Sequence, residues 1–387
     1  MSARSSRRQS SSNTVRLVLL FLVIGLFLLI GVCCGAYALL SSVFDESEPA
    51  EPEAKAALSV AYSPEKELAF SELVDRFNSQ GLQASDGEPM TVEAIRLDPE
   101  AMINAVLDGN ATFQAMTPDS GVWLGQLDQT WSEQLGDEGA VAVGETTRYA
   151  VSPVVIATWE GLAREIGWPD RSVGWQDLLA RAQTDPNVRW SHPSTSSASG
   201  LLATLAEFYA GAGKTRGLTI DDVMADETLE YVAELENTVR YYGEGNETAI
   251  IERALEEGRG FLDAFVVQEQ MVVYFNRFRE AEQERLVALY PVEGTLWEDH
   301  PLALLETTDL SPYHRQVFAE FRDFLLSPEA QQLILEHGYR PADLSLSPDS
   351  PDSPLTDANG VDPTEPKTTL QIPNAGVIQV VRDAWWY

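Results

Sequence analysis

The strongest constraint on the fold is an alternation of strand and helix patterns that begins at residue 57. A short apolar run at 57–62 precedes an amphipathic helical pattern, and an alternating run at 90–97 precedes a second helix at 99–109. The stretch 112–127 then predicts a strand, a polar loop and a helix that begins near Ser120. Strands joined by short helical crossovers form parallel sheets. We therefore expect an α/β fold.

Length and charge narrow the class of protein. The chain has 387 residues, enough for two domains of ordinary size. Its 60 acidic and 26 basic residues give a formal net charge of −34. Such a field opposes contact with nucleic acid, so no nucleic-acid partner is expected, although a local pocket can still bind a ligand of either charge.

No motif for enzyme chemistry or for a cofactor stands out. Cys33 and Cys34 are the two cysteines, and both lie in an apolar segment, which leaves the rest of the chain without thiolate chemistry or a disulfide framework. The segment GAGKT at 211–215 resembles part of a phosphate-binding loop, but Phe208 stands where that pattern requires glycine. The four histidines lack metal-ligand spacing: His192, His300, His314 and His337. We expect no enzyme activity, no metal site and no cofactor.

The N-terminus has the pattern of a membrane anchor. A basic tail at 1–16 precedes an uncharged apolar run at 17–40, and an acidic linker follows at 41–56. At 1.5 Å per residue the run reaches about 36 Å, enough to cross a bilayer core of about 30 Å. The charge asymmetry places the bulk of the chain outside the cytoplasm. A signal peptide cleaved after the small residues at 36–38, with secretion of the remainder, is the alternative.

A cluster of hydroxyl residues at a helix entrance is the first candidate binding feature. Ser194, Thr195, Ser196 and Ser197 follow a short strand and open a strongly apolar helix. Backbone N–H groups at such an entrance are unpaired and carry the positive end of the helix dipole, which suits an oxyanion or another polar group. The simpler alternative is a helix cap within a serine-rich loop.

Three further polar sites occupy equivalent places in the pattern. Ser63 directly follows the first strand, Thr117 and Ser120 follow the third, and Ser152 interrupts an apolar strand. Singly, each is explained as a cap or turn residue. Together they indicate a ligand site, because ligands of parallel α/β sheets bind outside the carboxyl ends of the strands.

Several segments together carry a family resemblance. They are DAFVVQEQMVVYFNR (263–277), LVALYPVEGTLWEDHPLALL (286–305), VFAEFRDFLLSPEAQQLILEHGYRPA (317–342) and HPSTSSASGLLATL (192–205). They resemble bacterial extracellular solute-binding proteins of ABC transport systems, in the type 2 periplasmic-binding branch with molybdate-, sulfate- and iron-binding members. The resemblance covers about 57–342.

The resemblance implies a two-lobed type 2 periplasmic-binding-protein fold, with a mainly parallel sheet flanked by helices in each lobe. Lobe one would comprise 57–150 and 263–342, and lobe two 151–262. The hydroxyls named above and Glu269 would contact the ligand in the cleft between the lobes. An acid at Glu269 suits a cation or an amine, or it caps a helix.

The C-terminal part falls outside the resemblance. The Pro-, Asp- and Ser-rich segment 343–367 has the composition of a linker. The apolar segment 368–387 would pack on a lobe or on a partner, since an exposed aromatic terminus is unfavourable.

Two functions are implied by the resemblance. In the first, the chain captures a small polar or anionic ligand, such as an oxyanion, for an ABC permease. In the second, it is a membrane-anchored binding or assembly module that works with a protein partner. Some anchored members of the family carry a von Willebrand factor A domain after such a module, which makes a protein with that domain the expected partner.

Overall fold

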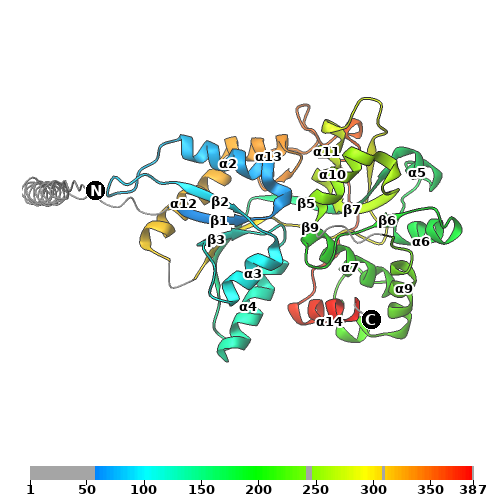
Figure 1. Cartoon of the computed structure of the whole chain (residues 1–387), viewed down its shortest axis with the longest axis horizontal. Coiled ribbons are helices and arrows are strands. Elements are labelled where there is room, and N and C mark those ends of the chain that lie inside the picture. The colour runs from blue at the N-terminus through cyan, green and yellow to red at the C-terminus, as the bar shows by residue number, and fades with distance from the viewer. Residues whose placement is uncertain (1–56, 241–245, 307–309, 386–387) are drawn as a thin grey trace, which may run out of the picture. The chain divides into compact units, whose positions relative to one another are not determined.

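The computed structural model describes residues 57–240, 246–306 and 310–385 (Figure 1). The tail at 1–16, the expected anchor at 17–40 and the linker at 41–56 lie outside the described residues. Residues 56–387 form a compact unit by themselves. None of the helices within the described ranges combines the length and apolarity needed to cross a bilayer.

The first sheet has five strands in the order β2-β1-β3-β10-β4. β1 pairs in parallel with β2 and β3, whereas β10 runs antiparallel to β3 and β4. The strands are β1 Leu58–Tyr62, β2 Val92–Arg96, β3 Ala115–Thr117, β4 Val143–Arg148 and β10 Pro301–Leu305.

Helices cover this sheet on both faces (Figure 1). They are α2 Glu67–Ser79, α3 Pro99–Leu107, α4 Val122–Leu135, α12 Pro312–Leu325 and α13 Pro328–Glu336, together with the short 3₁₀ helix η1 Pro64–Lys66. The apolar residues of α2 recur at helical spacing, so one stripe of that helix faces the core. In that core the ring of Phe321 from α12 meets Phe70 and Phe77 of α2, with ring centroids 6.0 Å and 5.1 Å apart.

The second sheet is built around the long strand β5. Its principal order is β11-β5-β7-β6, and β5 also pairs with β8 and β9. The strands are β5 Ala150–Trp159, β6 Trp190–Ser191, β7 Ala264–Gln268, β8 Leu286–Leu289, β9 Trp297–Glu298 and β11 Arg340–Pro341. Every residue of β5 except Val151 is buried, as expected for a strand covered on both faces.

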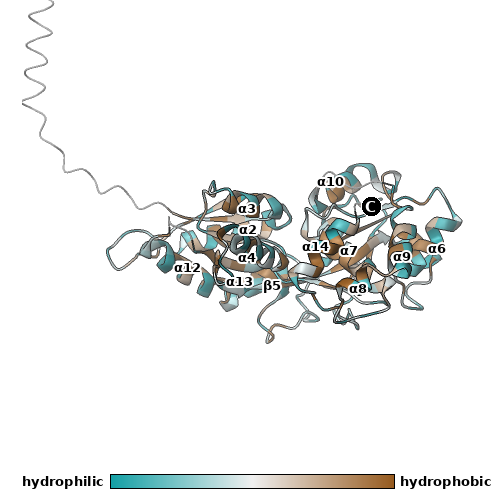
Figure 2. Cartoon of the chain, turned by 90° about the horizontal axis from the view of Figure 1, so that it is seen from below, coloured by the Kyte–Doolittle hydropathy of each residue, from teal (hydrophilic) through white to brown (hydrophobic). Residues whose placement is uncertain are grey.

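The remaining helices accompany the second sheet. They are α5 Glu160–Glu165, α6 Trp175–Thr184, α7 Ala198–Gly211, α8 Ile220–Val223, α9 Asp226–Glu236, α10 Glu247–Glu257, α11 Glu269–Phe278 and α14 Ala375–Trp385, with the 3₁₀ helices η2 Gly258–Gly260 and η3 Asp357–Asn359. Figure 2 shows α7 largely in brown, which agrees with the burial of residues 198–209 in this helix.

Fewer neighbouring strands run parallel to one another than the sequence predicts. In the second sheet only β6 and β7 pair in parallel among the described strands, while β5 is antiparallel to each of its partners. The expectation of a mainly parallel sheet in each lobe was therefore wrong for this half. Local patterns locate a strand, but its direction in the sheet depends on partners that lie far away in sequence.

The sheet pairing also differs from the expected lobe boundaries. Residues 263–342 were expected in lobe one, yet β7 and β8 pair with β5 in the second sheet. Only β10, α12 and α13 of that range accompany the first sheet, where Phe318 and Ile334 enter its core. The chain thus crosses between the two sheets near β9 and β10 as well as near β5.

Candidate functional site

Polar side chains gather where β1 and β3 end. Ser63 follows β1 and is fully buried, and the side chain of Lys66 is 2% exposed. The Lys66 ammonium donates hydrogen bonds to Thr117 Oγ1 at 3.0 Å and to the Pro118 carbonyl at 2.8 Å. It also lies 3.5 Å from the carboxylate of Asp119, so a buried ion pair closes this end of the first sheet.

The segment between β9 and β10 brings two more ionisable groups to the same place. Glu298 and His300 are both fully buried. The His300 backbone N–H donates to the Asp119 carbonyl at 2.9 Å, and its Nδ1 lies 3.4 Å from Asp119 Oδ1. Its Nε2 lies 4.0 Å from Glu298 Oε2. The intervening Asp299 instead accepts a hydrogen bond from the Gly121 N–H at the start of α4.

The second sheet contributes groups that meet those of the first. Ser199 lies in the first turn of α7, Glu247 begins α10 and Gln268 ends β7, and all three are buried. Glu247 Oε2 accepts the Gln268 backbone N–H at 2.7 Å. Burial raises the pKa of Glu247 to about 8, and the nearby charge of Asp119 adds to that effect.

These groups are called the junction below. Its members are Ser63, Glu65, Lys66, Asp119, Ser199, Glu247, Gln268, Glu298 and His300.

The acidic side chains of the junction differ in how readily they ionise. Burial raises the pKa of Glu65 and of Glu298 well above their usual range, and neighbouring carboxylates raise both further. Burial also opposes ionisation of Asp119, but Lys66 and then His300 outweigh it and lower the pKa of Asp119. Burial lowers the pKa of His300, so its imidazole is neutral. Asp119 is thus the acid that ionises most readily, with Lys66 as its partner.

Much of the junction lacks internal hydrogen bonds. Several buried side chains there have polar atoms without a hydrogen-bond partner among the described residues: Ser63 Oγ, Ser199 Oγ, both amide atoms of Gln268, both carboxyl oxygens of Glu298 and both ring nitrogens of His300. An unsatisfied buried polar group costs about 1–3 kcal/mol, and folded proteins contain few of them. Such a concentration at one point is typical of a site that binds a polar ligand.

The hydroxyls predicted at Thr117, Ser120 and Ser152 lie at or beside the junction, where Ser152 of β5 pairs with Glu298 of β9. Thr117 Oγ1 accepts from Lys66, and the Ser120 hydroxyl accepts the Val122 N–H at 3.3 Å as part of the turn into α4. The Ser152 hydroxyl accepts the Gln270 N–H at 3.3 Å. These contacts are compatible with both interpretations of the sequence, in which the hydroxyl residues either stabilise turns or contact a ligand.

The serine loop is used mainly for local structure. Ser197 is the N-cap of α7 and accepts the Gly200 N–H at 3.1 Å. The hydroxyls of Ser194 and Ser196 lie 2.5 Å apart, and Thr195 is buried beside them. The hydroxyl of this stretch that belongs to the junction is Ser199, one turn further on.

Glu269 has a strong partner within the chain. Its carboxylate forms a bidentate ion pair with Arg340 at 2.8 Å and 2.7 Å, and it also accepts the Tyr290 hydroxyl. Its side chain is fully buried.

The charged members of the junction were not among the site residues predicted from the sequence. Lys66 and Glu247 lie in amphipathic helical patterns, where charged residues are usually exposed. Glu298 and His300 belong to the segment 286–305, whose resemblance to a family was the one available signal.

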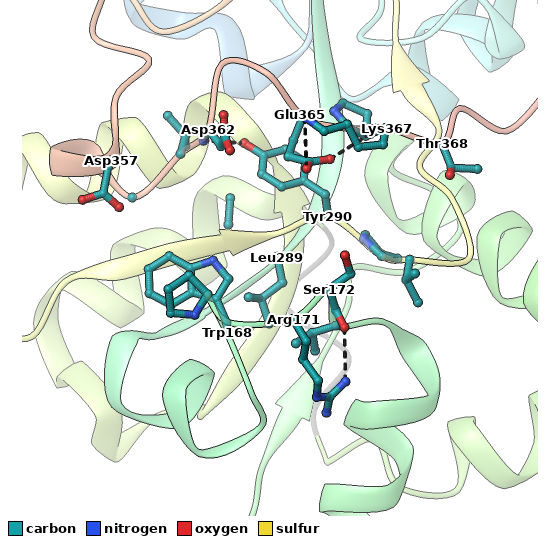
Figure 3. Close-up of a pocket in the computed structure, with 18 of the residues that line it drawn as sticks. Trp168, Arg171, Ser172, Leu289, Tyr290, Asp357, Asp362, Glu365, Lys367 and Thr368 are labelled. Carbon is teal, nitrogen blue, oxygen red and sulfur yellow. Dashed lines mark hydrogen bonds and ion pairs between the residues drawn. The ribbon is translucent and has the colours of Figure 1, made fainter.

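Two cavities are lined by a member of the junction or by residues next to its members in sequence. One of about 650 Å³ is lined by Ser120, Asp299 and residues of the C-terminal segment, and one of about 160 Å³ by Glu65, Gln270 and Tyr339 among others. A third cavity of about 440 Å³ lies between Trp168, Tyr290 and Lys367 (Figure 3). That cavity shares no residue with the junction.

Comparison with solved structures supports the fold. The sulfate-binding protein SubI from Mycobacterium tuberculosis H37Rv is 19% identical, with a TM-score of 0.51 over 75% of this chain and 88% of its own. A periplasmic thiamin binding protein is 14% identical, with a TM-score of 0.58 over 86% of this chain and 95% of its own. Iron-bound HitA from Pseudomonas aeruginosa is 16% identical, with a TM-score of 0.53 over 85% and 99%. These structures share the two-sheet α/β architecture.

Sequence comparison identifies the family. No curated protein matches the chain. The family model described as bacterial extracellular solute-binding protein matches residues 58–340, which includes both sheets and every member of the junction. The chain therefore belongs to the bacterial extracellular solute-binding proteins.

Proposed function

We propose that the chain captures a small polar solute at the junction, outside the cytoplasm, and delivers it to an ABC permease. The observation that carries the proposal is the convergence of buried, unpartnered polar side chains from both sheets: Ser63 from the first, Ser199 and Gln268 from the second. Solved structures of the same fold include a sulfate-binding protein, a thiamin binding protein and an iron-bound protein, and these three ligands are all small solutes.

The predicted hydroxyl residues form part of this proposal, whereas the Glu269 carboxylate is paired with Arg340. Ser63 is the strongest of them, because its hydroxyl is fully buried and faces the Asp119 carboxylate. Anchoring through 17–40 would keep the receptor at the membrane surface, and cleavage would release it. The alternative role beside a von Willebrand factor A domain protein stays a prediction.

A binding experiment on the full-length chain tests the function. Native mass spectrometry would first identify any small molecule that copurifies, and thermal unfolding would then be followed with that molecule or with sulfate, thiamin and divalent metal chlorides. A true ligand at a hundred times its dissociation constant stabilises the folded state by about 2.7 kcal/mol.

Two variants locate the binding. Ser63→Ala removes a fully buried hydroxyl that faces Asp119, so affinity is expected to fall about tenfold, which corresponds to one lost hydrogen bond. Ser71→Ala removes a half-buried hydroxyl from α2, outside the junction, and should bind as the wild type does. Equal affinity in both variants, or the absence of any ligand for the wild type, would reject the proposal.

A further inference from the structure

Three side chains of the junction lie close enough together to hold one metal ion. Asp119, Glu298 and His300 each offer one donor atom, and these three atoms all lie within 4.8 Å of one another. An ion with bonds of about 2.0–2.2 Å to nitrogen and oxygen holds its donors about 3–4.4 Å apart. Side-chain shifts of a few tenths of an ångström would therefore complete the site.

The side chains nearest this point lack other partners. Glu298 and His300 are fully buried, and neither the carboxyl oxygens nor the ring nitrogens meet a hydrogen-bond partner in the described part of the chain. Independently, Ser63 is fully buried, and its hydroxyl faces the Asp119 carboxylate closely enough to lower the pKa of that acid. All of these atoms would gain a partner if a ligand occupied the centre of the group.

The charges around the site favour a cation. Glu65 and Glu247 lie near Asp119 and Glu298, and neighbouring carboxylates contribute to the raised pKa values of Glu65, Glu247 and Glu298. Lys66 is the basic side chain paired with this group, and its ammonium is already engaged by Thr117, Pro118 and Asp119. An anion here would face four carboxyl groups, whereas a cation would stabilise their ionised forms.

The backbone holds His300 in an unusual conformation. Its φ of +34° is positive, and it is the one non-glycine residue with this property among those described. Such backbone strain costs about 1–3 kcal/mol and is found preferentially at ligand-binding sites. The turn directs the Asp299 side chain to α4 and leaves its neighbours Glu298 and His300 at the junction.

We propose that the solute is a divalent first-row transition-metal ion bound by Asp119, Glu298 and His300. This inference rests on the proposed function and names its ligand class. One imidazole nitrogen with two carboxylate oxygens suits ions such as Mn²⁺, Fe²⁺ or Zn²⁺, whereas Ca²⁺ and Mg²⁺ prefer oxygen donors throughout.

A second buried cluster provides the comparison. His192, Glu207 and Glu236 also offer donor atoms close together. There, however, Glu236 accepts a hydrogen bond from Trp385 Nε1 at 2.5 Å and lies 3.2 Å from His192 Nε2. Glu236 and His192 are thus paired within the chain, whereas both carboxyl oxygens of Glu207 are buried without a hydrogen-bond partner in the described ranges, so this cluster is the comparison site.

The test is metal titration of the full-length chain after removal of bound ions with EDTA. Isothermal titration calorimetry with MnCl₂ and ZnCl₂ at pH 7.5 should show one site per chain. Co²⁺ at the same site should give a visible absorption spectrum that reports nitrogen and oxygen ligation. Glu298→Gln and His300→Asn are each expected to weaken binding at least tenfold, while Glu207→Gln should bind as the wild type does.

The variants are chosen so that folding does not obscure the result. Glu298 is already held in its neutral form, which glutamine resembles, and asparagine tolerates the positive φ of His300. Urea unfolding midpoints of each variant without metal would confirm that it folds.

The outcomes separate this inference from the function on which it rests. If sulfate, thiamin or a copurified organic solute binds while Mn²⁺ and Zn²⁺ do not, the metal assignment fails and the solute-binding function stands. If no compound binds, both fail. Metal binding that Glu207→Gln abolishes and Glu298→Gln preserves would also overturn the assignment, as would several weak sites equally affected in all variants.

Discussion

At the scale of single residues, Glu269 illustrates how a candidate ligand contact can be a structural residue. Its carboxylate and the Arg340 guanidinium are both buried, and the pair is bidentate. Removing one partner of a buried pair leaves the other charge uncompensated, at a cost of about 3–5 kcal/mol. Glu269→Gln should therefore lower the free energy of unfolding by about that amount, measured with urea, and leave solute affinity unchanged.

The exposed pair between Glu306 and Arg315 supplies the control. Glu306→Gln should cost about 1 kcal/mol or less, because solvent-exposed ion pairs contribute little. A Glu269→Gln protein with normal stability and weakened solute binding would instead make Glu269 a ligand residue.

Residue patterns predicted hydroxyl groups at the site better than charged ones. Ser63 and Thr117 stand at strand ends, where a local rule applies. Lys66 and Glu247 sit in amphipathic helices, and their burial depends on segments that are far away in sequence. A single sequence contains no local signal for such burial, which is why these two charged residues of the junction were not foreseen.

At the scale of elements, α14 joins parts of the molecule that are distant in sequence. It packs against α7 and α8 on one side and α4 on the other, and Val377, Ile378 and Val381 are buried in the shared core (Figure 2). Arg382 pairs with Glu100 of α3 at 2.5 Å. The helix thus links helices that accompany both sheets.

Truncation of the buried face of α14 tests this role. Ile378→Ala should lower the free energy of unfolding by about 2–5 kcal/mol, the usual cost of deleting a buried branched side chain. Gln379→Ala changes the exposed neighbour on the same helix and should stay within about 0.5 kcal/mol of the wild type in urea unfolding. Equal midpoints for the two variants would show that α14 contributes no packing energy.

The positions of helices along the chain were predicted more successfully than the pairing of strands within the sheets. The helical patterns after residues 63, 98 and 197 correspond to η1 with α2, to α3 and to α7. The pairing of β7 and β8 with β5 was missed, because sheet partners depend on tertiary packing. An apolar C-terminal segment was expected to pack on a lobe or a partner, and α14 does lie against the helices of this chain.

At the scale of the whole molecule, acidic residues outnumber basic ones and give a formal net charge of −34. Several of these acidic side chains are buried within the fold. Glu65, Glu207, Glu247 and Glu298 all have pKa values raised above their usual range, primarily by burial. Each of them binds a proton more tightly in the folded state than in the unfolded state. The metal-free protein should consequently lose stability as the pH rises above about 5.

Glu247 gives this expectation a defined pH range. Its pKa is raised from 4.5 to about 8, so its contribution is fully present below pH 4.5 and is lost as the pH rises through 8. Within that range each such carboxyl lowers the free energy of unfolding by about 1.4 kcal/mol per pH unit. Glu247→Gln keeps an oxygen that can accept the Gln268 N–H but no longer titrates, so the variant should show a shallower decline.

Urea unfolding of the full-length wild type and of Glu247→Gln, in EDTA at pH 5, 6.5 and 8, measures how steeply the free energy of unfolding of each protein declines with pH. The variant should gain stability relative to the wild type at pH 8 and differ least at pH 5. Glu282→Gln changes an exposed acid for which no such gain is expected. Parallel wild-type and Glu247→Gln curves would mean that Glu247 is ionised in the folded protein, and the junction would then hold more negative charge than its burial indicates. A metal ion that stabilises those ionised carboxylates should reduce the wild-type decline when EDTA is replaced by MnCl₂.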